Sequence, residues 1–255
     1  HLREDVYFHD SPAFEGVKGR KVTAHDFVYS FERILDPETA SPGSWIFSDK
    51  IAADSPFVAL DDTTFELNLQ RPFRPMLGIL SMQYTYVVPQ EAVGHFGKEF
   101  RANPVGTGPF RMKSWQEDEA LILERNPQYF ETGPDGAQLP YLDEVVVSFI
   151  ENKSSEFMSF LNGELDFVSD IDPGLKDLIL DLEGNLQEQY EDDINLTRSP
   201  YLNTEYLGFI VDPDNNSAAA SPTVNQAVRQ AINYSFNRKQ MIRFLRNNKG
   251  IPASF

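Results

Sequence analysis

The chain has 255 residues, 41% of them apolar, so it is long enough to bury a sizeable core in two small lobes or in one large α/β unit. Its 39 acidic residues outnumber the 22 basic ones, and the resulting net charge of −17 argues against nucleic acids and anionic membrane surfaces as partners. The absence of cysteine excludes disulfides, thiolate metal sites and a cysteine nucleophile.

The first forty residues predict a strand and one clear helix. The strand is expected over residues 2–8. The helix begins at Thr23 with a capping-box pattern, in which Asp26 reaches back to the amide of Thr23, and it ends before Pro37. The apolar positions of this helix form one buried stripe: Phe27, Val28, Phe31, Ile34 and Leu35.

Two aromatic residues, Trp45 and Phe47, follow the end of this helix and fall outside its stripe. They come after a Ser-Pro-Gly sequence, which favours a loop. Two interpretations fit them: ordinary packing, or a loop whose rings face a ligand.

Short elements continue to about residue 100. They are a hairpin over residues 57–60 and 64–69, a short helix entered through Pro75, a strand over residues 84–89, and a helix over residues 90–96 ended by Gly97.

The middle of the chain predicts a sheet. Residues 110–115 and 120–126 are expected to pair as strands, and residues 143–150 are apolar enough for a central strand buried on both faces. A helix capped by Ser154 then leads to a strand over residues 165–169. This order predicts a β-α-β unit with a right-handed crossover.

The last part of the chain predicts one more strand and two helices. The strand is expected over residues 204–212. After a polar connector, Thr223 is expected to cap the first helix, and the second begins at Arg238.

No catalytic or metal-binding motif emerges from the sequence. There is no G-x-S-x-G or H-E-x-x-H pattern, and the four histidines lie far apart. Gly106 to Gly108 precede a strand instead of opening a helix, so a phosphate loop is not expected there. The sequence from Asp212 starts like a calcium loop but has Ser217 and Thr223 where Gly and Glu are needed. We therefore expect no cofactor, no metal and no enzymatic activity.

Aromatic and uncharged polar residues recur where strands end. They occur around Trp45, in the turn from Ser169 to Ile171, and in the segment from Ser199 to Tyr206. Rings with small polar groups at strand ends are typical of a recognition cleft. Half-buried packing of Trp45 and Tyr201 is the alternative.

Six segments in order resemble the family 5 extracellular solute-binding proteins, the oligopeptide- and dipeptide-binding receptors of ABC importers. They are LREDVYFHD, GRKVTAHDFVYSFERILDPETASP, NPVGTGPFRMKSWQEDEALILERNPQYF, LPYLDEVVVSFI, LNGELDFVS and VRQAINYSFNRKQMI. Family members are roughly twice as long, so the resemblance implies an internal fragment that lacks the signal segment and most of the second lobe.

The resemblance implies an α/β fold of the periplasmic-binding-protein type (type II). In that fold two lobes close like a hinge around the ligand, and an extra α/β subdomain packs on the first lobe. Residues 1–104 then correspond to the extra subdomain and residues 105–203 to part of the first lobe. Residues 204–255 correspond to the hinge strand and the start of an incomplete second lobe.

The resemblance also implies which residues bind the ligand. By position, the residues that line the cleft are Gly43, Ser44, Trp45, Ser169, Asp170, Tyr201 and Asn203. Two departures concern this site. Peptide binders can show a tyrosine where this chain has Gly43, and the acidic group that pairs with a peptide's amino terminus would fall beyond Phe255.

The implied function is capture of an oligopeptide-like solute and its delivery to an ABC permease in the inner membrane. The implied location is the periplasm, or the cell envelope if the protein is lipid-anchored. An oligosaccharide or a metal chelate is the alternative ligand, with Trp45 stacking on a sugar ring. A hydrolase is the remaining alternative, and no nucleophile–base pair supports it.

Overall fold

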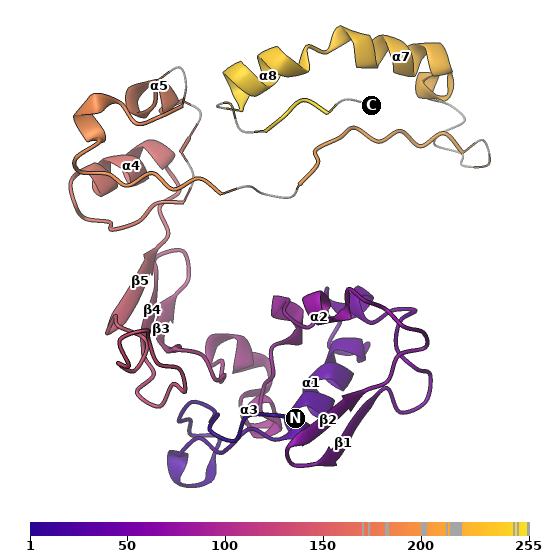
Figure 1. Cartoon of the computed structure of the whole chain (residues 1–255), viewed down its shortest axis with the longest axis vertical. Helices are drawn as coiled ribbons and strands as arrows, with labels where there is room; N and C mark the ends of the chain where they lie inside the picture. The colour runs from indigo at the N-terminus through magenta and orange to yellow at the C-terminus, as the bar shows by residue number, and fades with distance from the viewer. Residues whose placement is uncertain are drawn as a thin grey trace. The chain divides into compact units, whose positions relative to one another are not determined.

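The chain divides into two compact units in the computed structural model, unit 1 (residues 1–149) and unit 2 (residues 150–255), shown in Figure 1. The structure describes residues 1–169, 171–172, 174–181, 184–199, 203–212, 214, 221–246, 248 and 250–253. Within these ranges, every helix is too short or too polar to cross a membrane.

Unit 1 contains helices, short 3₁₀ turns and two antiparallel sheets. Its helices and turns are η1 (Glu15–Val17), α1 (Ala24–Leu35), η2 (Ser44–Ile46), α2 (Met76–Ile79), η3 (Gln83–Thr85), α3 (Gln90–Phe96) and η4 (Gly97–Ala102). Its strands are β1 (Phe57–Asp61), β2 (Thr64–Leu67), β3 (Phe110–Gln116), β4 (Ala120–Arg125) and β5 (Glu144–Ser148). Strands β1 and β2 form a hairpin, and the other sheet has the order β3-β4-β5.

The regular elements of unit 2 are helices and short 3₁₀ turns, joined by irregular segments, over its described residues. Its elements are α4 (Lys153–Leu161), α5 (Lys176–Ile179), η5 (Glu188–Tyr190), η6 (Pro222–Val224), α7 (Gln226–Ser235) and α8 (Arg238–Leu245). The mixture of helices and strands in the chain agrees with the α/β class predicted from the sequence.

Helix α1 begins and ends where the sequence predicts. The amide of Thr23 donates to Asp26 Oδ2 (2.8 Å), and both halves of the predicted capping box are present. The hydroxyl of Thr23 also lies 3.2 Å from the same oxygen. Asp36 adopts an extended conformation before Pro37, so the helix stops at Leu35.

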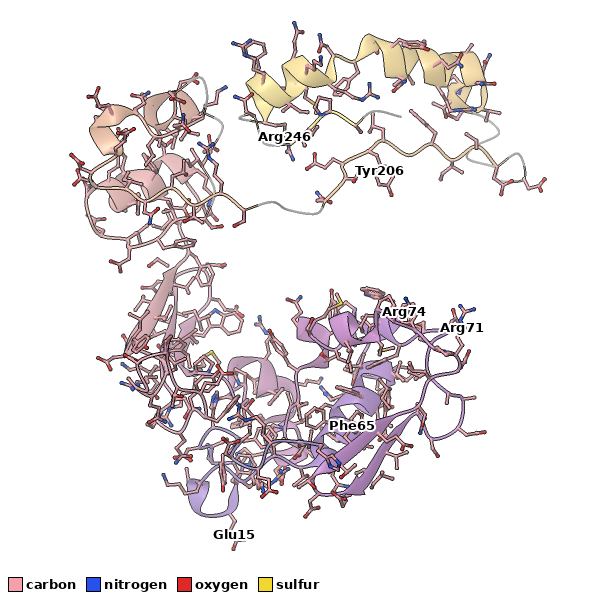
Figure 2. The ribbon with its side chains drawn as sticks, viewed as in Figure 1. Glu15, Phe65, Arg71, Arg74, Tyr206 and Arg246 are labelled. Atoms are coloured by element: carbon pink, nitrogen blue, oxygen red, sulfur yellow. The ribbon has the colours of Figure 1, made fainter. Side chains whose placement is uncertain are left out.

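Phe31 of α1 is the centre of an aromatic core. Its ring centroid lies 5.3–5.4 Å from those of Phe47, Phe57 and Phe65, and Figure 2 labels Phe65 on the hairpin beside α1. Ile46 and Phe47 are both fully buried. Phe47 thus belongs to the core, which decides for packing between the two interpretations of this residue. Leu35, assigned to the buried stripe, is 36% exposed at the end of the helix.

Arg20 links the first turns of α1 and α3. Its guanidinium donates to both carboxylate oxygens of Asp26 (2.6 and 2.9 Å) and to both of Glu91 (2.6 and 2.8 Å). It also lies 5.3 Å from the centre of the Phe8 ring. The two carboxylates raise the pKa of Arg20, and the hydrogen bonds from Arg20 lower the pKa of Glu91. Asp26 is 3% exposed, so this pairing satisfies a buried charge.

His9 joins the amino-terminal segment to the loop that precedes β3. Its Nε2 donates to Gly108 O (2.9 Å), its amide donates to Gly106 O (2.8 Å), and Asn126 Nδ2 donates to Gly108 O (3.0 Å). The Gly106–Gly108 segment therefore packs on His9 and leads into β3. This confirms that the segment precedes a strand, as predicted. Burial lowers the pKa of His9 below its ordinary value, so the imidazole is held in its neutral form.

The position predicted for residues 143–150 in the sheet is wrong. Strand β5 pairs with β4 alone and lies at one edge of the described sheet. Val146 is 55% exposed, although the apolar run predicted burial on both faces. An apolar run indicates a strand but does not show how many neighbours it has in the sheet.

Four other predicted strands do not form in the described residues. Residues 2–8 contribute one bridge, Tyr7 to Lys21, and residues 84–89 form the turn η3 followed by extended backbone. Residues 165–169 and 204–212 are irregular, so the predicted β-α-β unit is absent from these described segments. A strand needs a partner for its backbone groups, and the alternation of residues along one segment does not identify that partner.

Two of the capping residues in unit 2 also differ from the prediction, each by two positions. Asn152, not Ser154, caps α4 through a bond from the Ser155 amide (2.9 Å). Asn225, not Thr223, caps α7, which is preceded by the turn η6. Asn237 caps α8 as expected. Asparagine is as good a cap as serine or threonine, so the sequence alone does not show which of several neighbouring residues caps a helix.

We expect the substitution Phe31→Ala to destabilise unit 1 by about 3–5 kcal/mol, because it removes the ring at the centre of the aromatic core. The free energy of unfolding can be measured by urea titration. Leu77→Ala is the control, since Leu77 is 81% exposed and should change stability by less than about 0.5 kcal/mol. Equal effects of the two substitutions would contradict the proposed core.

We expect the protein to lose stability on acidification partly through His9. The pKa of His9 in the folded state lies below the unfolded value of about 6.5, so the unfolded state binds the proton more readily. The contribution of neutral His9 to the free energy of unfolding is fully present above the pKa that His9 has in the unfolded state. It is lost as the pH falls through the pKa that His9 has in the folded state. Between pH 7.5 and pH 5, urea unfolding should show a smaller loss of stability for His9→Gln than for the unsubstituted protein.

Candidate ligand-binding site

The turn η2 presents the first group of predicted ligand-binding residues. Ser44 and Trp45 are exposed, with Trp45 at 51%, whereas the next two residues, Ile46 and Phe47, are fully buried. The buried pair anchors the turn in the aromatic core of unit 1. The indole of Trp45 is therefore held at the surface by its immediate neighbours in sequence.

Lys50 fixes the carboxyl end of this turn. Its Nζ donates to the carbonyl oxygens of Trp45 (3.1 Å) and Ser48 (3.0 Å), and it lies 5.9 Å from the centre of the Phe73 ring. A cation near carbonyl groups at the end of a turn interacts favourably with their partial negative charge. Lys50 thus restrains the backbone that carries Trp45.

Gly43 is buried, and the ring of Tyr84 covers it. A Cβ atom on Gly43 would lie 2.6 Å from Tyr84 Cδ1 and 2.8 Å from Tyr84 Cβ. Tyr84 also meets Trp45 edge-to-face, with a centroid distance of 6.3 Å and an interplanar angle of 77°. The lack of a side chain at Gly43 therefore leaves room for the Tyr84 ring, and this ring covers Gly43 from solvent.

Tyr84 is a candidate site residue that the sequence did not reveal. It was assigned to a strand, whereas it lies in η3, where the Thr85 hydroxyl donates to Leu80 O (2.9 Å) and Met82 O (2.8 Å). Nothing in the sequence pattern connects position 84 with position 43. Only the packing of η3 beside η2 brings the two rings together.

The second group of predicted residues belongs to unit 2. Ser169 and Asn203 are exposed there. Asp170 and Tyr201 lie outside the described residues. The role of these four residues as ligand contacts stays a prediction.

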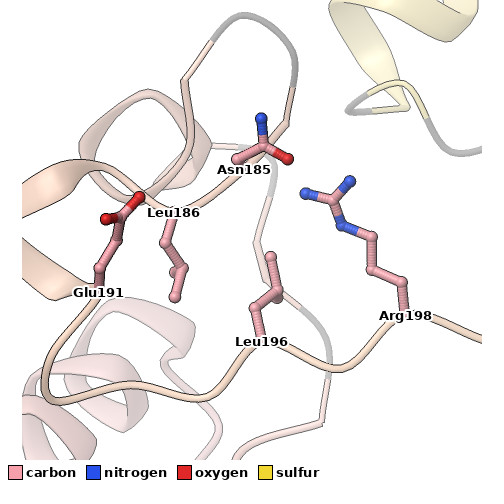
Figure 3. Close-up of a pocket in the computed structure, with 5 residues that line it drawn as sticks. All are labelled: Asn185, Leu186, Glu191, Leu196 and Arg198. Atoms are coloured by element: carbon pink, nitrogen blue, oxygen red, sulfur yellow. The ribbon is translucent and has the colours of Figure 1, made fainter.

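Unit 2 also contains an open hollow of about 420 Å³, shown in Figure 3. It is lined by Asn185, Leu186, Glu191, Leu196 and Arg198. Arg198 has no ion pair with any described residue, and its guanidinium lies against the turn at Gly184. No sequence motif connects these residues, so the sequence does not predict a hollow here.

The described side chains do not assemble a metal centre. Among them, no group of three His, Asp or Glu residues could hold a metal ion. His9 is bound to Gly108, and His25 lies 3.6 Å from Asp62 at the surface.

The chain is similar to proteins that bind solutes outside the cell. The model of the bacterial extracellular solute-binding proteins, family 5 Middle, matches residues 1–254. The periplasmic oligopeptide-binding protein OppA of Salmonella typhimurium is 31% identical over 99% of this chain and 44% of its own length.

Two solved structures show the same likeness. DppA from Helicobacter pylori, in complex with the peptide STSA, is 30% identical with a TM-score of 0.59, over 70% of this chain and 36% of that chain. A periplasmic oligopeptide-binding protein from Borrelia burgdorferi is 25% identical with a TM-score of 0.71, over 99% of this chain and 47% of that chain. The chain thus spans less than half the length of these relatives.

We expect Trp45 to be more accessible to solvent than Trp115, which is half-buried with Arg101 4.5 Å from its ring centre. The variants Trp115→Phe and Trp45→Phe each leave one tryptophan in this chain. Acrylamide should quench the emission of the first variant more strongly than that of the second. The opposite order would show that the η2 turn does not hold Trp45 at the surface.

Proposed function

The chain belongs to the bacterial extracellular solute-binding proteins of family 5, and we propose that it is part of the substrate-binding component of an ABC importer. The match of the family model over residues 1–254 carries this proposal. The solute that we propose is an oligopeptide, because relatives at about 30% identity are named as oligopeptide-binding or were solved with a peptide bound.

Capture of a peptide through its backbone explains how such a receptor accepts varied sequences. Every peptide offers the same N–H and C=O groups, so main-chain hydrogen bonds supply affinity that does not depend on the side chains. Pockets for the side chains then tune the preference. Recognition of the backbone and of the side chains at the same time requires a rigid scaffold with a few exposed rings and polar groups.

We propose that the exposed residues of η2, Ser44 and Trp45, contact the solute, together with Ser169, Asp170, Tyr201 and Asn203. The exposure of Trp45 on a turn anchored in the core supports this assignment. Gly43 contributes differently, by leaving room for the ring of Tyr84.

The same proposal extends to the parts of the chain. Residues 1–104 form the extra subdomain, and their two clusters of buried residues, one around Phe31 and one around Phe8, support this assignment. Residues 105–203 contribute to the first lobe, which begins with the sheet β3-β4-β5. Residues 204–255 form the hinge segment and the start of the second lobe.

The receptor delivers its solute unchanged to a permease in the inner membrane. It therefore acts without catalysis. We place it in the periplasm, as the names of the relatives indicate, or at the cell envelope through a lipid anchor.

We expect isothermal titration calorimetry to show binding of short peptides, such as trialanine, and no binding of maltotriose. The substitution Trp45→Ala should weaken peptide binding about tenfold, in the range for loss of a large buried contact. The control Trp115→Phe should leave the affinity unchanged. Binding of maltotriose without binding of peptides would favour the oligosaccharide alternative and contradict the proposal.

A further inference from the structure

Trp45 and Tyr84 form a two-ring surface on unit 1, called here the aromatic corner. The rings come from two turns, η2 and η3, and meet edge-to-face at 6.3 Å. Tyr84 is half-buried in the core cluster, whereas Trp45 is 51% exposed. One ring is thus fixed by the core, and the other leans on it and faces solvent.

The polar atoms of the aromatic corner have no partner in the described part of the protein. The indole N–H of Trp45 and the hydroxyl of Tyr84 donate to no other described residue. Partly buried tryptophan and tyrosine side chains usually hydrogen-bond through these atoms. The corner therefore offers one exposed ring, that of Trp45, and two donors without a described partner, as a recognition surface does.

We infer that the aromatic corner is a subsite for a neutral aromatic side chain of the bound solute, with Tyr84 as the residue that positions Trp45. This inference rests on the proposed function and adds to it a preference among peptides. An aromatic guest packs against the exposed face of Trp45 in an offset or edge-to-face arrangement. Lys50, held by the Trp45 carbonyl, disfavours a positively charged side chain at the same place.

Gly43 makes this arrangement possible. Its φ of −87° is ordinary for any residue, so the backbone does not require glycine there. The ring of Tyr84 does, because a Cβ atom would lie 2.6–2.8 Å from three atoms at the base of that side chain. These atoms cannot swing away as a flexible chain end could. Any larger residue at position 43 must displace Tyr84 and with it the support of Trp45.

The first test compares peptides that carry one phenylalanine with a peptide that carries none. Calorimetry of the purified protein with trialanine, Phe-Ala-Ala, Ala-Phe-Ala and Ala-Ala-Phe should show that at least one phenylalanine peptide binds about two- to tenfold more tightly than trialanine. Tyr84→Ala should remove this preference, so that the phenylalanine peptides bind no more tightly than trialanine. Tyr84→Phe, which keeps the ring, should retain most of the preference.

A spectroscopic readout follows Trp45 directly. In the Trp115→Phe background, the preferred phenylalanine peptide should shift or quench the Trp45 emission. Tyr84→Ala should abolish this change, and trialanine should cause little of it. A purely structural role of Tyr84 would instead weaken the binding of all peptides by the same factor and would keep the preference for the phenylalanine peptide.

Gly43→Ala provides an independent variant. If Tyr84 positions Trp45, Gly43→Ala should reduce the preference as much as Tyr84→Ala does, and the double variant should lose no more than either single one. An unchanged preference in Gly43→Ala would overturn the inference. Equal binding of all four peptides by the unsubstituted protein would overturn it too, while the proposed function would stand. Failure of every peptide to bind would overturn both.

Discussion

Burial of Ile46 and Phe47 is the constraint on which the candidate site depends. Both side chains are fully buried, and the ring of Phe47 packs on Phe31 and Phe57. Because they follow Trp45 directly, the turn cannot rotate without opening the aromatic core of unit 1. The direction of the indole is therefore set before any ligand arrives, and a preset contact avoids the entropy of ordering a loop on binding.

The charge of the chain has a different role from its rings. The guanidinium of Arg20 is shared between Asp26 and Glu91, and this places a cation at the first turns of α1 and α3, where two carboxylates converge. Among the described acidic residues only Asp26 is buried, and the surplus of negative charge favours solubility. A lysine and apolar burial restrain the η2 turn. Acidic surface residues are therefore not what holds this part of the candidate site in place.

The elements that the sequence predicts well are those specified by neighbouring residues. Asp26 and Pro37 define α1, Gly97 ends α3, and an Asp-Asp turn gives the β1–β2 hairpin. The predictions that are wrong depend on distant partners: residues 165–169 and 204–212 have the composition of strands but no strand beside them in the described structure. The candidate site also depends on distant partners. The sequence leaves both packing and exposure open for Trp45, and the fit of Tyr84 over Gly43 depends on tertiary packing.

This fit gives Gly43 a packing role that is separate from the ligand contact implied by the resemblance, and that contact stays a prediction. The resemblance assigns Gly43 to the cleft, where relatives can carry a tyrosine, yet here the position is buried and an aromatic ring reaches the same surface from η3. An exposed tryptophan forgoes much of the free energy that burial of its ring would contribute, about 25 cal/mol for each Å² of apolar surface. Trp45 is anchored by the core and supported by a second ring. Its exposed face contributes this free energy only when another molecule covers it. A bound solute is the partner that the proposed function supplies.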